Sequence, residues 1–488
     1  MKNDIKNSKK GNFHKLKESK LYSRINSFFV ILILLIVAGV IVLVARGYTL
    51  NLSNFTITTT GILRVNTTPN NSNVYLNGHY IGTSPVVLNS LNPGSYNLRI
   101  ESNNYVAWQS LVTVKPSIIT NIDAFLIPSK INQSIVSTDG YVYKTFYKYQ
   151  NNYLYIIVET LSKEYKVYYL DLSQINKSTL PIYLFNLSKK LNFNPKYNIN
   201  IMSDYSNSYL LIEYNKIYYL YDVSSGKLSL FNLPYINNIN KVSFAGSSEY
   251  IIIQSGSLLG SVNISTGQAY LFLFGSEDFH YEILGSQIVY TYYDLSNNET
   301  DIFISNIDGT DKITLTKISG KVTNLLGNNF GGYIVASSNN GYNYLLSIKN
   351  DILSGRIKFA KNYNLVSFRD QNNYIILSKA NSLYAYYIGN SSYTLISNDY
   401  SSMYNLTPFD LGSYIFYQQK NSSGGTLSIY EQAIGSNNKY LISNNSIGNY
   451  YISPGDNYLL FNYAFKGGKK YLYVVNLIKN SSIFPFSL

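Results

Sequence analysis

The chain has 488 residues, and its 39 Lys and Arg outnumber its 26 Asp and Glu, which gives a formal net charge of +13. The absence of Cys excludes disulfide frameworks, thiolate catalysis, Cys-ligated zinc and iron–sulfur clusters, and three widely separated His do not predict a His-rich metal site. With 51 Tyr, 31 Gly and only 11 Pro, the composition favours an all-β protein made of aromatic strands and frequent turns.

An uncharged apolar segment lies near the N-terminus. Residues 25–45 contain no charged side chain, and as a helix these 21 residues would span about 31 Å, which matches a hydrocarbon core of about 30 Å. We therefore predict a basic cytoplasmic tail at residues 1–27 and a transmembrane helix at residues 28–46. The side chains expected to anchor the chain in lipid are Phe28, Phe29, Ile31, Leu32, Leu34, Leu35, Ile36, Val40, Ile41 and Leu43.

The basic residues of the N-terminal region lie mostly before the apolar segment. Residues 1–46 hold nine basic and two acidic side chains, and eight of the basic ones precede residue 25. The positive-inside rule then predicts a single-pass cell-membrane protein with a cytoplasmic N-terminus and extracytoplasmic domains in residues 47–488. The side chains expected to set this topology are Lys9, Lys10, Lys15, Lys17, Lys20 and Arg24.

Two alternatives concern this region. A cleaved signal peptide would have a shorter basic region and a small-residue cleavage site, and no A-x-A site ends the apolar run. The basic tail could also bind nucleic acid phosphates, but a tail held at an inner leaflet already has anionic lipid headgroups beside it. We therefore expect an uncleaved anchor, with membrane lipid as a partner and no nucleic acid.

Short strands are predicted after residues 47–59, which we interpret as a polar linker. Asn77-Gly78 lies between two short hydrophobic runs and is the strongest short-range signal for a hairpin. Tyr96, Leu98 and Ile100 then alternate with polar residues, as in a strand with one buried face. Residues 60–128 therefore predict a small β-sandwich.

The order and spacing of residues 61–128 resemble the PEGA domain of bacterial and archaeal surface proteins. The resemblance implies an extracytoplasmic β-sandwich that serves envelope or surface proteins without catalysis, and it assigns no ligand-binding residues. The motif positions are therefore expected to be structural; they include Pro69, Asn77, Gly78, Gly82, Pro85, Pro93, Gly94 and Tyr96.

Eight similar hydrophobic strand openings recur along the rest of the chain. Their intervals are 56, 41, 37, 46, 41, 40 and 44 residues, close to the spacing of four-stranded propeller blades. We predict a seven- or eight-bladed β-propeller at residues 129–488. A pair of stacked β-sandwiches is the rival architecture, but it would not require a regular interval. The openings begin at Leu154, Leu210, Ile251, Ile288, Ile334, Ile375, Ile415 and Leu459.

Turn sequences repeat with the strands. Val223-Ser-Ser-Gly226, Ile264-Ser-Thr-Gly267 and Ile307-Asp-Gly309 each follow an apolar strand end, and Gly permits the positive φ of a tight turn. Residues 307–316 and 451–461 resemble a turn, an outer strand and a following strand of TolB-like propellers, and several units resemble WD40-like ones. The resemblance implies blades rather than any activity.

Catalytic motifs are not found in the sequence. It has no G-x-S-x-G, no phosphate-binding G-x-x-x-x-G-K-[ST] and no H-E-x-x-H. The run Glu277-Asp278-Phe-His280 is interpreted as a solvated turn, because one local run rarely supplies converging metal ligands. We predict no catalytic, cofactor-binding or metal-binding residue. Acidic residues that could still pair across blades are Glu159, Glu164, Asp294, Glu299, Asp308 and Asp311.

The leading functional hypothesis is a non-enzymatic binding or scaffold protein of a prokaryotic cell envelope. Its propeller would recognise an envelope protein or a cell-wall polysaccharide, since tyrosine side chains can stack on sugars or peptides. The alternative is an envelope glycan hydrolase or lyase with carboxylates in the propeller channel. A third hypothesis is an envelope sensor or assembly subunit, which a tail of 27 residues supports least.

Overall fold

The protein is represented by a computed structural model of the full chain. It describes residues 30–35, 37–39, 48–51, 56–126, 128–129, 133–136, 138–147, 152–175, 180–231, 239–245, 249–275, 279–328, 332–349, 352–368, 374–388, 391–408, 414–421, 425–434, 439–453, 457–464 and 469–477. The fold is all-β, as the composition predicts, with short helices α2 (Leu187–Leu191) and η2 (Tyr400–Ser402) in the described regions.

The N-terminal region is described only in part. Residues 30–35 and 37–39 are helical, and their apolar side chains are exposed. Over the residues that the structure describes, no helix is long and apolar enough to span a lipid bilayer. The other predicted anchor positions (Phe28, Phe29, Ile36, Val40, Ile41 and Leu43) and all six topology residues (Lys9, Lys10, Lys15, Lys17, Lys20 and Arg24) lie outside the described residues.

Residues 47–59, predicted as a linker, contain a small two-stranded sheet. Strand β1 (Tyr48–Asn51) pairs antiparallel with β2 (Thr56–Thr59), with Tyr48 opposite Thr59. The short polar segment thus satisfies part of its backbone hydrogen bonding within itself.

Residues 60–126 form the predicted β-sandwich. One sheet has the order β6-β3-β9 and the other the order β5-β4-β7-β8. Burial alternates along β3 and β8, so that one face of each strand packs in the core, where Leu63, Val65, Leu98 and Ile100 are fully buried. The strands are β3 (Gly61–Thr68), β4 (Asn73–Leu76), β5 (His79–Thr83), β6 (Val86–Leu91), β7 (Gly94–Glu101), β8 (Trp108–Val114) and β9 (Ile119–Phe125).

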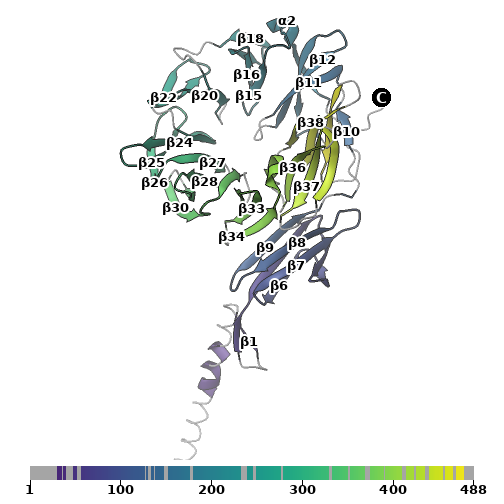
Figure 1. Ribbon diagram of the computed structural model, residues 1–488, viewed down its shortest axis with the longest axis vertical. Helices are drawn as coiled ribbons and strands as arrows, with labels where there is room; N and C mark the ends of the chain where they lie inside the picture. Colours follow the sequence, from purple (N-terminus) through teal and green to yellow (C-terminus); the bar gives the residue numbers. More distant parts are fainter. Residues whose placement is uncertain are drawn as a thin grey trace, which may run out of the picture. The chain divides into compact units, whose positions relative to one another are not determined.

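The rest of the described chain forms a ring of four-stranded units, or blades, which is a β-propeller (Figure 1). Six blades are separate sheets. Blades 1 to 3 comprise β11 (Gly140–Tyr147), β12 (Tyr153–Thr160), β13 (Tyr165–Asp171), β14 (Ile182–Asn186), β15 (Ile199–Ser203), β16 (Tyr209–Tyr214), β17 (Ile217–Asp222), β18 (Lys227–Leu230), β19 (Lys241–Phe244), β20 (Tyr250–Ser255), β21 (Leu258–Asn263) and β22 (Ala269–Leu273). Blades 4 to 6 comprise β23 (Tyr281–Leu284), β24 (Gln287–Asp294), β25 (Glu299–Asn306), β26 (Ile313–Ser319), β27 (Val322–Asn328), β28 (Tyr333–Ser338), β29 (Asn343–Lys349), β30 (Ile352–Phe359), β31 (Asn364–Ser367), β32 (Tyr374–Lys379), β33 (Ser382–Tyr387) and β34 (Ser392–Ser397).

Blades 7 and 8 share one long strand and so form a single seven-stranded sheet. The first part of β38 (Lys439–Ile452) pairs with β37, and its second part pairs with β39. Described in this way, the ring has eight blades, the upper of the two predicted numbers. The remaining strands of this sheet are β35 (Tyr404–Pro408), β36 (Tyr414–Lys420), β37 (Leu427–Ala433), β39 (Tyr458–Ala464), β40 (Lys470–Asn476) and β10 (Gln133–Val136).

Strand β10 completes blade 8 and closes the ring. It comes from the beginning of this part of the chain and pairs antiparallel with β40, with Ser134 opposite Val474 and Val136 opposite Leu472. Val136 is buried in a cluster that also includes residues of blade 1, among them Val142 and Leu154. The last blade therefore depends on a strand about 340 residues earlier in the sequence.

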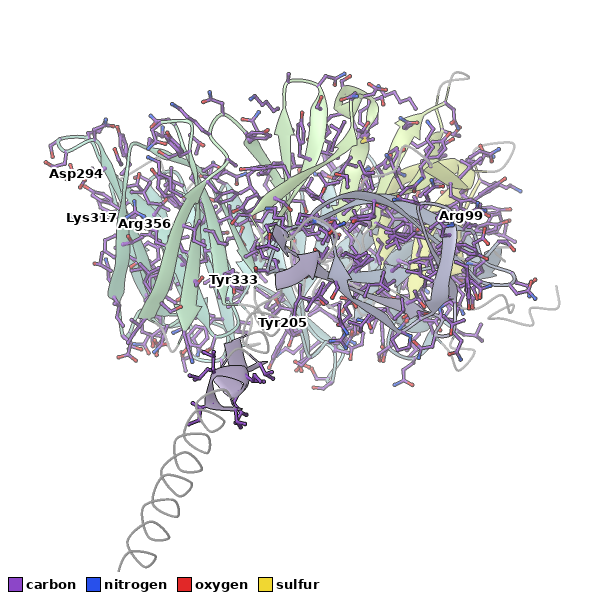
Figure 2. The ribbon with its side chains drawn as sticks, turned by 90° about the horizontal axis from the view of Figure 1, so that it is seen from below. Arg99, Tyr205, Asp294, Lys317, Tyr333 and Arg356 are labelled. Carbon is purple, nitrogen blue, oxygen red and sulfur yellow. The ribbon has the colours of Figure 1, made fainter. Side chains whose placement is uncertain are left out.

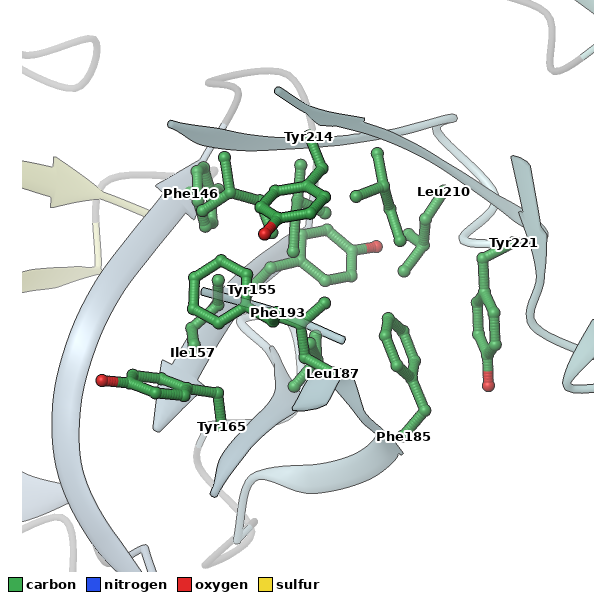
Figure 3. Packing of buried hydrophobic residues seen from close by; sticks show 14 residues of the cluster. Phe146, Tyr155, Ile157, Tyr165, Phe185, Leu187, Phe193, Leu210, Tyr214 and Tyr221 are labelled. Atoms are coloured by element: carbon green, nitrogen blue, oxygen red, sulfur yellow. The ribbon is translucent and has the colours of Figure 1, made fainter. Parts of the chain in front are cut away.

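The eight hydrophobic openings found in the sequence all lie in the second strand of a blade, and their first residues, from Leu154 to Leu459, are fully buried. These strands are buried on both faces. Ile375 and Leu377 of β32 pack with blade 5, whereas Ile376 between them packs with blade 7. Aromatic side chains fill the space between blades, as Tyr155, Phe193 and Tyr214 do between blades 1 and 2 (Figure 3).

The ring has two faces. Because neighbouring strands of a blade are antiparallel, the turns after its second and fourth strands leave from one end, and the other turns leave from the opposite end. Asp294, which ends the second strand of blade 4, lies at one face, and Tyr205, which follows the first strand of blade 2, lies at the other (Figure 2). We refer to them as the Asp294 face and the Tyr205 face.

Candidate functional site

The motif positions of the β-sandwich have structural contacts. Asn77 and Gly78 both have positive φ, as the predicted hairpin requires, and the Asn77 side chain accepts a hydrogen bond from the Asn97 amide at 2.8 Å. Pro93 lies between β6 and β7, Gly94 begins β7, and the Tyr96 hydroxyl donates to the carbonyl of Asn92 at 2.7 Å. Other motif residues are also at turns or strand ends: Pro69 follows β3, Gly82 lies in β5 with φ 143°, and Pro85 precedes β6.

The acidic residues considered for catalysis mostly contact their own turns. Hydrogen bonds from the Ser296 and Asn297 side chains hold the pKa of Asp294 below its ordinary value, and the Thr310 hydroxyl does the same for Asp308. Glycoside hydrolysis needs a carboxyl that stays protonated, and these two carboxyls are held in the ionised form.

The other acidic candidates are similarly placed. Glu164 forms an ion pair with Lys189 at 3.5 Å and accepts a hydrogen bond from Asn186. Asp311 accepts one from the Asn306 side chain at 2.8 Å, while Glu159 and Glu299 lie in β12 and β25. Within the described ranges, no group of three His, Asp or Glu could hold a metal ion; Glu277 and Asp278 are outside those ranges.

A buried carboxyl that the sequence analysis did not single out is Glu431 in β37. It is 3% exposed, its Oε1 has no hydrogen-bond partner in the described residues, and burial raises its pKa well above the ordinary value. Tyr414, whose pKa is also raised by burial and by Glu431, is buried with it. A Glu inside the apolar strand sequence of residues 427–434 was the signal that could have identified it. Because it is enclosed, it is not open to a substrate.

Positive charge is concentrated in one part of the ring. Residues 313–398 contain eight basic and two acidic residues, a net of +6, whereas residues 47–312 have 16 and 18 and residues 399–488 have six and four. The net charge of residues 47–488 is also +6, because residues 1–46 contribute +7 of the +13. The excess of basic over acidic residues in residues 47–488 therefore lies in blades 5 and 6 and the outer strand of blade 4.

Two of these cations share one tyrosine ring. The Lys358 Nζ lies 3.6 Å from the centre of the Tyr342 ring and the Lys361 Nζ lies 5.3 Å from it. The two ammonium groups are therefore at most 8.9 Å apart, the sum of these distances. At that separation they repel each other by about 0.5 kcal/mol in water and about 2 kcal/mol at an effective dielectric constant of 20. An anion placed between them would relieve this repulsion.

Tyr363, on the neighbouring turn, carries the next cation. The Lys379 Nζ lies 5.1 Å from the centre of its ring, and the Tyr393 ring stacks against it at 5.4 Å. The turns that hold Tyr342 and Tyr363 are joined directly, because the Asn362 amide donates to the Gly341 carbonyl at 2.6 Å. Both turns follow a second or fourth strand, so they lie on the Asp294 face.

Arg356 extends the same group along β30. It lies two residues before Lys358, and alternate residues of a strand point to one side. Its guanidinium is over the Tyr344 ring and donates to the Lys317 carbonyl at 2.9 Å, which fixes its position. Figure 2 labels Arg356 and Lys317 close together. Lys317 itself is neutralised by Asp301 at 3.2 Å.

We call this group the basic–aromatic surface; it consists of Tyr342, Arg356, Lys358, Lys361, Tyr363 and Lys379. The four basic side chains are exposed, and none of them forms an ion pair with a carboxylate in the described part of the chain. Such a surface can bind anions by charge and polar polymers by its phenol groups. The surplus of basic residues in one segment was the sequence signal that could have pointed to it.

Residues 60–130 match the family model described as the PEGA domain, so this segment is a PEGA domain, as the resemblance implied. The comparison with curated proteins found no match.

Solved structures that have a fold similar to that of this chain include the following three. The WD40 domain of SCAP from fission yeast is 13% identical, with 73% of this chain and 100% of that chain covered and a TM-score of 0.43. A structure described as the eukaryotic initiation factor is 10% identical over 80% of this chain and 100% of that one, with a TM-score of 0.46. The β-propeller domain of Cps50 (Swd1) from Myceliophteria thermophila is 11% identical over 71% and 99%, with a TM-score of 0.38. These likenesses concern the fold alone.

Proposed function

We propose that the protein is a binding or scaffold protein of a prokaryotic cell envelope, anchored by one membrane span and without catalysis of its own. The PEGA domain and the propeller would lie outside the membrane, and the propeller would recognise the partner. The observation that carries the binding role is the basic–aromatic surface, where exposed cations gather on two neighbouring blades and have no carboxylate partner among the described residues. A rigid ring suits such a role, because it holds side chains from different turns in fixed positions.

The sequence supports the anchor. Residues 25–45 are uncharged and long enough to cross a bilayer, and the basic residues precede them. Side chains at Ile31, Leu34 and Leu35 are more than half exposed, an arrangement that is unfavourable in water and favourable in lipid. PEGA domains are typically extracellular, which agrees with the same orientation.

The topology can be tested in cells that express the full chain. Carbonate-washed membranes should retain the protein, and protease added to intact cells should degrade the propeller while leaving an epitope at the N-terminus protected. Release of the full chain into the medium, or protection of the propeller in intact cells, would contradict the proposed anchor. A variant with Lys9, Lys10, Lys15, Lys17, Lys20 and Arg24 all changed to Gln should lose its uniform orientation.

A further inference from the structure

We propose that the basic–aromatic surface binds an acidic polysaccharide, a polymer whose sugars carry carboxylates beside their hydroxyl groups. This inference rests on the proposed binding function and names its ligand class. It uses three properties that the surface has among the described residues: cations without acidic partners, phenol groups without hydrogen-bond partners, and aromatic rings with cations over them.

The cations are placed to receive several carboxylates. Lys358 and Lys361 lie over one ring, Lys379 lies over the next ring, and Arg356 continues the group along β30. All four belong to blades 5 and 6, on turns or strands that are bonded to one another. A polymer with a carboxylate on each sugar could contact several of them at once, and linked weak contacts bind more tightly than separate ones.

The phenol groups provide the second property. In the described residues, the hydroxyls of Tyr342 and Tyr363 have no hydrogen-bond partner, and both side chains are half-buried. A phenol can donate one hydrogen bond and accept others, which suits a sugar hydroxyl. Acidic polypeptides of Asp and Glu carry carboxylates but no hydroxyl groups, so they would use only the cations.

The covered aromatic faces distinguish the surface from a nucleic-acid site. Proteins that bind single-stranded nucleic acids stack bases on open aromatic faces. Here ammonium groups lie over the Tyr342 ring, and Tyr363 has Lys379 over its ring and Tyr393 stacked against it. The ammonium groups and the phenol hydroxyls remain available to a ligand, and these groups favour the polysaccharide.

The test uses the full chain in detergent and three polymer probes. Alginate carries carboxylates and hydroxyls, poly-glutamate carries carboxylates alone, and dextran carries hydroxyls alone. We expect binding to alginate, binding to poly-glutamate that is about tenfold weaker, and no binding to dextran, measured by biolayer interferometry at 0.05 M and 0.15 M salt.

Matched variants locate the site. Lys358→Gln with Lys361→Gln should weaken alginate binding by about tenfold or more. Tyr342→Phe with Tyr363→Phe should weaken alginate binding by about threefold to tenfold and leave poly-glutamate binding unchanged, because only hydroxyls are removed. The control is Lys241→Gln with Lys439→Gln, which removes two exposed lysines that also lie over tyrosine rings, at 4.9 and 4.6 Å, on other blades.

The outcomes separate the possibilities. Equal affinity for alginate and poly-glutamate, with no effect of the Tyr→Phe pair, would overturn the polysaccharide in favour of an acidic peptide. Tighter binding of oligo-deoxythymidine than alginate would overturn it in favour of nucleic acid, and an equal loss in the control pair would show binding by general charge. Failure to bind alginate by a chain with the proposed topology would remove this ligand class without touching the anchor, which the protease assay tests separately.

Discussion

The PEGA sandwich and the propeller bury their strands in different ways. In the sandwich, burial alternates along strands such as β3 and β8, which pack one face in the core and turn the other toward water. In the ring, the second strand of a blade is buried on both faces, as in β12 and β32, because it has a neighbouring blade on each side. A strand of the sandwich has one apolar face to bury, whereas a blade has two, one against each neighbouring blade.

This difference predicts how far the destabilisation caused by one substitution extends through each domain. A blade exposes an apolar face when its neighbour opens, so the stability of each blade includes the interfaces with both neighbours. The ring has no free end to open from only because β10 pairs with β40. In the sandwich, the buried residues of the two sheets lie within about 65 residues of one another in the sequence. The four predictions below test this contrast, beginning with the one that should have the largest effect.

The largest effect is expected where the ring closes. Val136→Asp would place a carboxylate in the cluster that Val136 forms with Leu472, Val474 and the first blade, where Val136 is 3% exposed. Burying an unpaired charge costs several kcal/mol, so we expect a loss of about 4 kcal/mol or more in the free energy of unfolding of the ring. Urea denaturation measures this loss. Limited proteolysis of the variant should show cleavage within residues 137–477.

The matched control is Val87→Asp, the same change at a site in the sandwich that is 48% exposed. It should alter the free energy of unfolding by less than about 0.5 kcal/mol. If Val136→Asp were as mild as this control, β10 would not be the closing strand in solution.

The second pair compares a core truncation in each region. Ile376→Ala removes a fully buried side chain whose cluster includes Ile396 of blade 6 and Ile415 of blade 7, and it should cost about 2–5 kcal/mol. Amide hydrogen exchange should rise in both blades. Leu98→Ala in the sandwich should cost a similar amount, with faster exchange within residues 60–126. Exchange confined to blade 6 in the Ile376→Ala variant would contradict the idea that neighbouring blades are stabilised together.

The third prediction concerns the buried carboxyl of β37. Burial raises the pKa of Glu431 above its ordinary value of 4.5, so the unfolded chain ionises this group at a pH where the folded chain keeps it protonated. The contribution of the protonated Glu431 carboxyl to the free energy of unfolding is therefore fully present below about pH 4.5, and it is lost as the pH rises toward the pKa of the folded chain. Glu431→Gln removes the loss, and the free energy of unfolding at pH 7 should rise by about 1.4 kcal/mol for each unit of the pKa shift.

Thermal unfolding of both proteins between pH 4 and pH 8 measures this effect. The Glu431→Gln variant should match the wild type near pH 4 and exceed it increasingly above pH 5. Parallel pH profiles for the two proteins would contradict this prediction, because they would show that folding does not shift the pKa of Glu431. The sandwich provides the contrast, because the Gln variant should leave hydrogen exchange in residues 60–126 unchanged.

Local sequence signals predicted the elements that depend on neighbouring residues. The eight openings identified the second strand of every blade, and Asn77-Gly78 identified the hairpin, because burial on both faces and a tight turn each impose a short pattern. Three features were not predicted, and each joins residues far apart in the chain. They are the pairing of β10 with β40, the enclosure of Glu431, and the grouping of Tyr342 with Lys358 and Tyr363 with Lys379. The repeat interval of the strands does not indicate which turns come together when the ring closes.

The smallest effect is expected at a turn of the sandwich. Gly78 has φ +84° in the hairpin between β4 and β5, and a Cβ there would have no heavy atom within 4 Å. Gly78→Ala should therefore cost only the backbone strain of a left-handed conformation, about 1–2 kcal/mol, without a steric clash. Gly94→Ala is the control, because Gly94 lacks a positive φ and its nearest neighbour would be 4.0 Å away, so it should be nearly neutral. Differential scanning calorimetry of the two variants measures the difference. Equal stability of both would mean that the hairpin turn of the sandwich relaxes to accept a side chain, and hence that its register is held by strand pairing rather than by the turn.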